Sequence, residues 1–105
     1  MRNLEINMAI VTGSVLAKID SLNELLAMSL EHVRRSRSEP GCLAHAVHQD
    51  AENPLHLVFV EEWSNRKALV AHFAVPASRA FVKAVSSLTT EPPKINIYEA
   101  SAIQL

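Results

Sequence analysis

The chain has 105 residues, 49% of them hydrophobic, and its 10 basic and 11 acidic residues give a formal net charge of −1. This length fits one domain that buries about 60% or more of its unfolded surface, and it leaves no room for a separate cofactor domain. Cationic residues gather only in the short run Arg34-Arg35-Ser36-Arg37, which excludes the electrostatic footprint of a nucleic-acid-binding protein.

The single cysteine and the shortness of the apolar segments predict a cytoplasmic protein. Cys42 alone cannot form an internal disulfide, which favours a reducing compartment. No stretch reaches the length of a transmembrane helix, so we expect no membrane association. Arg2 precedes an apolar run at residues 8–17, but polar residues dilute this run, and its alternation favours a strand over a signal peptide.

The first predicted element is a strand at residues 8–17. It begins the domain, which we expect to span residues 8–105, and it leaves residues 1–7 as an N-terminal extension. The sequence Ser21-Leu22-Asn23-Glu24 has the spacing of a capping box and predicts the start of a long helix, which Pro40-Gly41 ends. Apolar side chains recur at helical spacing on one face of this helix: Leu22, Leu25, Leu26, Leu30 and Val33.

Residues 42–49 and 55–63 are predicted to pair as a β-hairpin. The second segment is rich in β-branched and aromatic residues, and the segment at residues 50–54, Asp-Ala-Glu-Asn-Pro, is typical of a turn. Ser64 is then predicted to cap a short helix. Side chains at spacings of three and four form the inner edge of that helix: Leu69, His72 and Phe73.

The C-terminal third completes the pattern of elements. Pro76 breaks the short helix, and a further helix carries an apolar stripe before Pro92-Pro93 stops it. Residues 94–100 alternate as a last strand. The order β-α-β-β-α-β, with the second helical segment split, predicts an α+β, ferredoxin-like fold built on one antiparallel sheet. The residues of the stripe are Phe81, Val82, Val85 and Leu88.

The strand at residues 55–63 has two apolar faces. Successive side chains of a strand point to opposite sides, so Leu57 and Phe59 face one way while Val58 and Val60 face the other. The helices cover only one face of such a sheet, and an uncovered apolar face is typical of an interface. We therefore expect a homodimer in which two sheets pack against each other.

Several motifs resemble the antibiotic biosynthesis monooxygenase family: Glu39-Pro40-Gly41-Cys42, Asn53-Pro54, the strand ending at Glu62-Trp63, and Ala71-His72-Phe73. The resemblance extends over about residues 8–100. The family consists of small dimeric proteins and includes cofactor-independent oxygenases of quinols and polycyclic aromatics. The resemblance implies a dimeric α/β barrel with a pocket between sheet and helices in each subunit. It places His72 on the family's recurrent helix histidine and His45 where relatives commonly carry a tyrosine.

The chain departs from the family pattern after His72. Relatives often have Thr-Pro-His-Phe there, whereas this chain has Val75-Pro76-Ala77-Ser78, so the second histidine is missing at Ala77 and a two-histidine mechanism is disfavoured. In the haem-degrading branch a tryptophan falls at the position of His72, and the haem-ligating histidine falls near Val82. We therefore predict no haem binding.

Other cofactor chemistries lack the residues that they need. His45 and His48 are three positions apart in a strand and face opposite sides, and no His-x-x-x-His pattern marks a helix, so the sequence predicts no metal site. Two glycines, Gly13 and Gly41, form no nucleotide-binding loop, and a Gly-x-Ser-x-Gly elbow is missing. We predict that the protein uses no cofactor.

An apolar pocket with imidazoles suits one chemistry without a cofactor. An ionised quinol passes an electron to dioxygen directly, so the protein supplies a base, an apolar slot for a flat ring and exclusion of water. Histidine is the natural base at neutral pH. We predict His72 as the catalytic base and expect a small aromatic or quinol-like substrate, with dioxygen as its partner. The predicted substrate-binding residues are Trp63 as a stacking wall, His45, His32, Phe73, and Tyr98 as a hydrogen-bond donor.

Other interpretations of these residues stay open. His72 is also consistent with a core histidine bonded to backbone, and Trp63 with an ordinary core residue. Arg79 either clamps an acidic substrate or lies on a helix surface. The alternative function is a non-oxidative pocket protein, either an isomerase of a small carbonyl compound or a ligand-binding module of the same fold.

Overall fold

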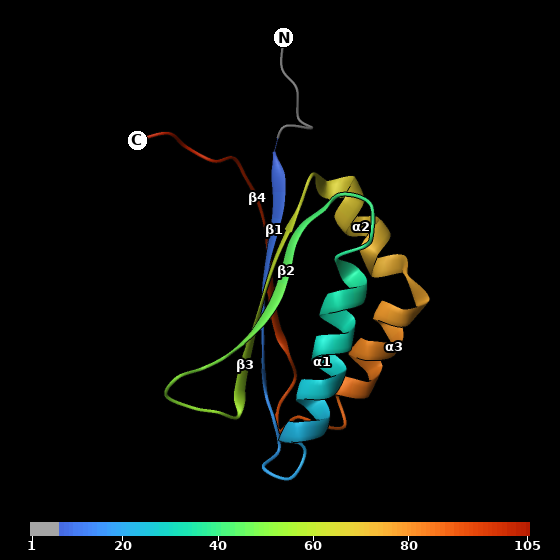
Figure 1. The fold of residues 1–105 in the computed structure, drawn as a ribbon, viewed down its shortest axis with the longest axis vertical. Helices are drawn as coiled ribbons and strands as arrows, with labels where there is room; N and C mark the ends of the chain where they lie inside the picture. Colours follow the sequence, from blue (N-terminus) through green and yellow to red (C-terminus); the bar gives the residue numbers. More distant parts are fainter. Residues whose placement is uncertain (1–6) are drawn as a thin grey trace.

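The computed structural model describes residues 7–105, and residues 1–6 lie outside the described part of the chain. The predicted N-terminal extension at residues 1–7 therefore falls almost wholly outside it and stays a prediction. The elements follow the predicted order (Figure 1). They are β1 (Met8–Leu16), α1 (Leu22–Ser36), β2 (Cys42–Gln49), β3 (His56–Trp63), α2 (Arg66–Ala74), α3 (Pro76–Val85) and β4 (Lys94–Ala100).

The four strands form one antiparallel sheet in the order β2-β3-β1-β4. The three helices lie together on one side of this sheet, as Figure 1 shows. Strand order and layering confirm the predicted ferredoxin-like α+β fold. In the part of the chain described, no single helix is long and apolar enough to cross a membrane, and α2 and α3 reach that length only when counted together across a bend of 71°.

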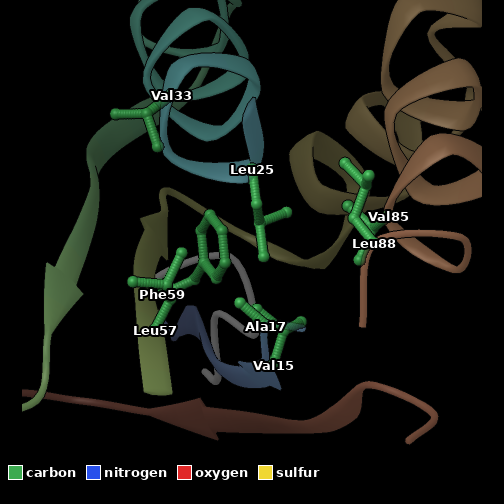
Figure 2. Close-up of a cluster of buried hydrophobic side chains, with 8 residues drawn as sticks. All are labelled: Val15, Ala17, Leu25, Val33, Leu57, Phe59, Val85 and Leu88. Carbon is green, nitrogen blue, oxygen red and sulfur yellow. The ribbon is translucent and has the colours of Figure 1, made fainter. Parts of the chain in front are cut away.

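The buried side chains form two hydrophobic clusters that hold the helices on the sheet. In the larger one, the side chains of Leu25 on α1 and Phe59 on β3 point toward each other (Figure 2). Burying each such side chain contributes roughly 1.5–3 kcal/mol. The larger cluster contains Val15, Ala17, Leu25, Val33, Leu57, Phe59, Val85 and Leu88. The smaller one contains Ala9, Val11, Trp63 and Leu69.

Helix α1 starts where the sequence predicts, but the predicted capping box does not form. Ser21 has backbone angles of φ −111° and ψ −2°, and its side chain makes no capping hydrogen bond within the described residues. A capping side chain normally needs extended backbone to reach back to the helix, which explains the loss. The predicted apolar face is also wrong at Leu30, which is exposed. The buried face of α1 also carries three polar residues, Ser29, His32 and Ser36.

The cap of α2 is Asn65, so the prediction of Ser64 is wrong by one residue. The Asn65 side-chain oxygen accepts a hydrogen bond of 2.9 Å from the backbone N–H of Ala68. The backbone N–H of Ser64 donates to the carbonyl of Gly41 instead, at 2.8 Å, which prolongs the pairing of β3 past its last residue. The backbone bond to Gly41, just before β2, therefore determines where α2 begins.

Helix α3 is shorter than its apolar stripe predicts. Pro76 is its first residue, where a missing N–H costs nothing, and α2 and α3 meet at Val75. The helix ends at Val85, yet Leu88 is buried in the turn that follows, while Val82 is largely exposed. β4 has the predicted bounds.

The two faces of β3 differ as the alternation predicts. Leu57 and Phe59 are buried beneath the helices, and Val58 and Val60 are half-buried on the opposite face. We call this opposite side of the sheet the open face. Cross-strand neighbours of Val60 on the open face are Thr12 and Ala46.

Candidate active site

A cavity of about 580 Å³ opens between the sheet and the helices. Its volume lies in the range of small-molecule sites. Most of its wall is apolar and comes from β1, β3, α2, α3 and β4: Val11, Val15, Phe59, Phe73, Phe81, Val82, Val85 and Ile95. Polar side chains on the wall are Ser14, His32, Glu61, His72, Ser78, Arg79 and Lys94. The cavity therefore suits a flat apolar ring that meets a few ionisable groups.

Three histidines from three elements meet at this cavity. His32 comes from α1, His45 from β2 and His72 from α2, and their ring centroids are 5.2 to 5.5 Å apart. All three are buried, with exposed fractions of 5%, 2% and 3%. His32 and His72 line the cavity, while His45 lies outside its wall. Residue separations along the chain do not reveal this meeting, because each histidine belongs to a different element.

Glu61 on β3 is the carboxylate of this cluster. It is the registered neighbour of His45 across the β2–β3 ladder. Its Oε1 atom lies 3.4 Å from Nε2 of His45 and 3.9 Å from Nε2 of His72, and it accepts a hydrogen bond of 2.9 Å from the indole N–H of Trp63. Burial acts to raise the pKa of Glu61, but His45, Trp63 and His72 together hold that pKa below its usual value.

Glu39, in the turn after α1, holds the ring of His72. Its Oε1 atom lies 2.8 Å from Nδ1 of His72, and the imidazole is 97% buried. A carboxylate at Nδ1 keeps the proton there, so the lone pair of the neutral ring is on Nε2. This nitrogen is the one that approaches Glu61, which itself lines the cavity.

His32 is held in the neutral form with the opposite tautomer. The guanidinium of Arg35 can only donate, so Nδ1 of His32 accepts its hydrogen bond of 2.8 Å and Nε2 carries the proton. Burial, and then the charges of His45, His72 and Arg35, lower the pKa of His32 to about 3. The ring stacks on Phe81 with centroids 4.2 Å apart.

The remaining predicted site residues lie at different distances from the cavity. Phe73 lines it. Trp63 is fully buried outside its wall, with its ring 4.6 Å from that of His72, so it supports the histidine rather than offering a free face. Tyr98 is exposed and pairs with Ile10 on the open face of the sheet, away from the helices. The structure thus brings five of the six predicted residues to the cavity or its first neighbours.

Sequence reasoning missed Glu61 and Glu39 as members of the site. For Glu61 a signal existed, because it shares strand parity with Leu57 and Phe59 and so carries a carboxylate on the buried face of β3. For Glu39 the sequence held no such signal, since its contact with His72 depends on how the turn after α1 lies against α2.

Comparisons with known proteins give one family. A model of the antibiotic biosynthesis monooxygenase family matches residues 8–84. An uncharacterized protein of Synechocystis is 35% identical over 95 residues, which is 90% of this chain, and the chain spans 65% of that relative's length. The crystal structure of a proposed antibiotic biosynthesis monooxygenase from Deinococcus radiodurans is 30% identical, with a TM-score of 0.87 over 92% of this chain and 97% of that one. A conserved protein of Methanosarcina mazei, 22% identical with a TM-score of 0.86 over 93% and 97% of the two chains, has the same fold.

Proposed function

Because this chain belongs to the antibiotic biosynthesis monooxygenase family, we propose that it is a cofactor-independent monooxygenase that oxidises a quinol or a polycyclic phenol with dioxygen. The observation that carries this proposal is the setting of His72. Its buried ring lines an apolar cavity, and Glu39 holds Nδ1 at 2.8 Å. A carboxylate on one ring nitrogen orients the imidazole and strengthens the other nitrogen as a base.

In the proposed reaction, Nε2 of His72 takes the phenolic proton, and Glu39 stabilises the imidazolium that forms. The ionised ring passes one electron to dioxygen, and the resulting radical pair combines as a hydroperoxide on a ring carbon that bears hydrogen. Loss of water from this hydroperoxide leaves a carbonyl, so one oxygen atom enters the product and the other leaves as water. The substrate supplies all four electrons, and no external reductant is needed.

The cavity wall serves the same chemistry. Phe73 and Phe81 offer aromatic surfaces on which a flat ring stacks, a contact worth about 0.5–1.5 kcal/mol beyond burial. Apolar neighbours exclude water, which would otherwise quench the reactive intermediates. Trp63 backs the ring of His72 and keeps it in place.

The pairing of Glu61 with His72 favours a second candidate function. Two ionisable groups 3.9 Å apart at one cavity form a pair in which one removes a proton and the other returns it to a neighbouring atom. Such a pair suits an isomerase of a small carbonyl compound. A ligand-binding module remains the non-catalytic form of this alternative.

We propose that residues 8–105 act as one domain and that two copies form a homodimer through the open face of the sheet, where Val58 and Val60 are only half-buried. We also propose a cytoplasmic location, which suits the free, half-buried thiol of Cys42.

Oxygen uptake with a panel of hydroquinones and hydroxylated naphthalenes tests the proposed activity. We expect one dioxygen consumed per quinone formed, with no added reductant. His72→Ala should lower turnover by about a hundredfold, the scale of general-base removal. Glu31→Ala, at an exposed position on α1 that lies outside the cavity wall and off the open face, is the control and should retain full turnover. Full uptake by the His72 variant would contradict the base assignment, and no uptake by the parent protein would favour the isomerase or binding function.

A further inference from the structure

We infer that the histidine cluster also binds a divalent transition-metal ion, with His45, His72 and Glu61 as its ligands. Nitrogen atoms from His32, His45 and His72 lie within 4.8 Å of one another, and all three residues are buried. The carboxylate of Glu61 approaches two of these rings. The three proposed ligands come from β2, α2 and β3, so the folded sheet and helix hold them together.

The two separations that involve Glu61 fit one ion with small movements, whereas the ligand nitrogens of His45 and His72, which lie within 4.8 Å of each other, would have to move closer together. Bonds of about 2.0–2.2 Å to imidazole nitrogen and carboxylate oxygen place two ligands of one ion about 3–3.6 Å apart. Oε1 of Glu61 is 3.4 Å from Nε2 of His45, which already fits. Its separation of 3.9 Å from Nε2 of His72 needs a shift of only a few tenths of an ångström.

The ligand types select the class of ion. Two imidazoles and one carboxylate on the same side of an ion, with further positions open, are typical of non-haem iron(II) and are also suited to zinc, cobalt and nickel. Glu61 and His72 both line the cavity, so the open positions would face it. Water or a substrate oxygen can then complete the coordination.

The neighbours of the three ligands resemble the outer sphere of a metal site. Glu39 holds the second nitrogen of His72 at 2.8 Å, the carboxylate–histidine arrangement that fixes the tautomer of a metal ligand. The indole N–H of Trp63 orients the Glu61 carboxylate at 2.9 Å. The Glu39 contact leaves Nε2 of His72 free for an ion, and the indole occupies one lone pair of Oε1 of Glu61 and leaves the other lone pair for the ion.

His45 provides an independent observation. Neither of its ring nitrogens makes a hydrogen bond of good geometry within residues 7–105, although the ring is 98% buried. The carboxylate contact of Nε2 is the long one of 3.4 Å to Oε1 of Glu61. A buried polar atom without a partner costs about 1–3 kcal/mol, and a bound ion is one of the ways in which proteins meet that cost. Binding through Nε2 would replace this long contact with Glu61 by an ion that both residues share.

His32 belongs to the cluster but is not a ligand in this proposal. Arg35 donates to its Nδ1, so its Nε2 carries a proton and offers no lone pair to a metal.

Metal binding has a consequence that rests on the proposed function. An ion that takes the lone pair of His72 Nε2 removes the base of the cofactor-independent reaction. Metal loading should therefore lower quinol oxidation by about the same hundredfold as loss of the base.

Titration with zinc chloride by isothermal calorimetry, on protein without an affinity tag, tests the site. We expect one ion per chain. His45→Gln and Glu61→Gln should weaken binding by at least about a hundredfold, and Glu39→Gln by about 10–100-fold, as for outer-sphere partners. His48→Gln is the matched control and should bind as the parent does. Cobalt(II) bound to the parent should show visible ligand-field absorption that zinc displaces.

The possible results distinguish failure of the metal site from failure of the proposed oxygenase. Stoichiometric binding that survives in both His45→Gln and Glu61→Gln, or no binding by the parent, overturns the metal site and leaves the proposed oxygenase untouched. If those two variants do not fold, the Glu39→Gln shift and the cobalt spectrum of the parent decide the question. Binding by a parent protein that oxidises no quinol supports the site and counts against the oxygenase. If quinol oxidation rises on metal loading, the metal site stands, but the predicted inhibition by the metal is wrong.

Discussion

His32 makes folding stability depend on pH at the scale of a single residue. Its pKa is lowered to about 3 in the folded protein from 6.5, so the unfolded chain takes up the proton first as pH falls. Its contribution to stability is therefore fully present above about pH 6.5 and declines toward pH 3. Between pH 7 and 5 we expect a loss of about 2 kcal/mol, measured by urea unfolding of the metal-free protein. His32→Gln should show a shallower pH dependence, and equal slopes would contradict this account.

Trp63→Phe removes the indole donor to Glu61 while keeping an aromatic ring in the core. Oε1 of Glu61 loses its hydrogen bond of 2.9 Å and keeps only the longer contacts with His45 and His72, and a hydrogen bond to a charged group contributes about 1.5–3 kcal/mol. We expect that loss in the free energy of unfolding, together with a higher pKa of the Glu61 carboxyl, which can be followed by carbon-13 NMR. Because Trp63 lies outside the cavity wall, ligand affinity should change less than stability. A variant with parental stability and strongly weakened ligand binding would refute this role.

Residue roles were predictable from sequence only where periodicity decides them. Helical spacing put His72 and Phe73 on the inner edge of α2, and both line the cavity. Helical spacing did not show which of His32 and Leu30 is buried, because the two lie within one turn of α1. Only the packing of α1 against α3 decides this. Tyr98 required the register of β4 on β1, which places it on the open face. Register depends on pairing between distant segments, and sequence periodicity does not encode it.

At the scale of elements, Gly41 couples the start of β2 to α2. Its φ of +82° lies in the left-handed region, and a Cβ there would stand 2.5 Å from Cβ of Ala68 and 2.8 Å from Oγ of Ser64. Gly41→Ala should therefore cost about 2 kcal/mol or more, from backbone strain plus the clash. Gly13→Ala is the matched control, because its Cβ would meet only ordinary contacts at 3.6 and 3.8 Å. Urea unfolding of both variants gives the comparison, and equal midpoints would disprove the coupling.

Element types were predictable because each strand and helix keeps one period along its length. Burial alternates without a break over β3, so its limits were nearly correct from sequence alone. The first residues of the helices were harder to predict from the sequence. Ser64 and Asn65 are both capping residues, and the backbone bond from Ser64 to Gly41 decides between them. That bond joins segments far apart in the chain, so local sequence cannot supply it.

At the scale of the whole molecule, the open face of the sheet predicts association. Val58 and Val60 are half-buried there although the same strand is fully buried on its helix side. Packing two such faces together would remove the exposed apolar surface from water, at about 25 cal/mol for each Å² buried. Sedimentation equilibrium at micromolar concentration should give twice the 11.6 kDa chain mass. A monodisperse monomer would be incompatible with this arrangement.

A charged substitution on the open face tests whether the dimer forms through that face or through another surface. Val60→Lys would bury an unpaired ammonium between two sheets, a cost that should weaken dimerisation by at least about a hundredfold, or about 3 kcal/mol. Val70→Lys, at an exposed position on α2 that is remote from the open face, is the matched control. We expect the first variant to sediment as a folded monomer and the second as the parent does. If both variants remain dimeric, the contact between copies lies elsewhere, and the half-buried valines of β3 need another explanation.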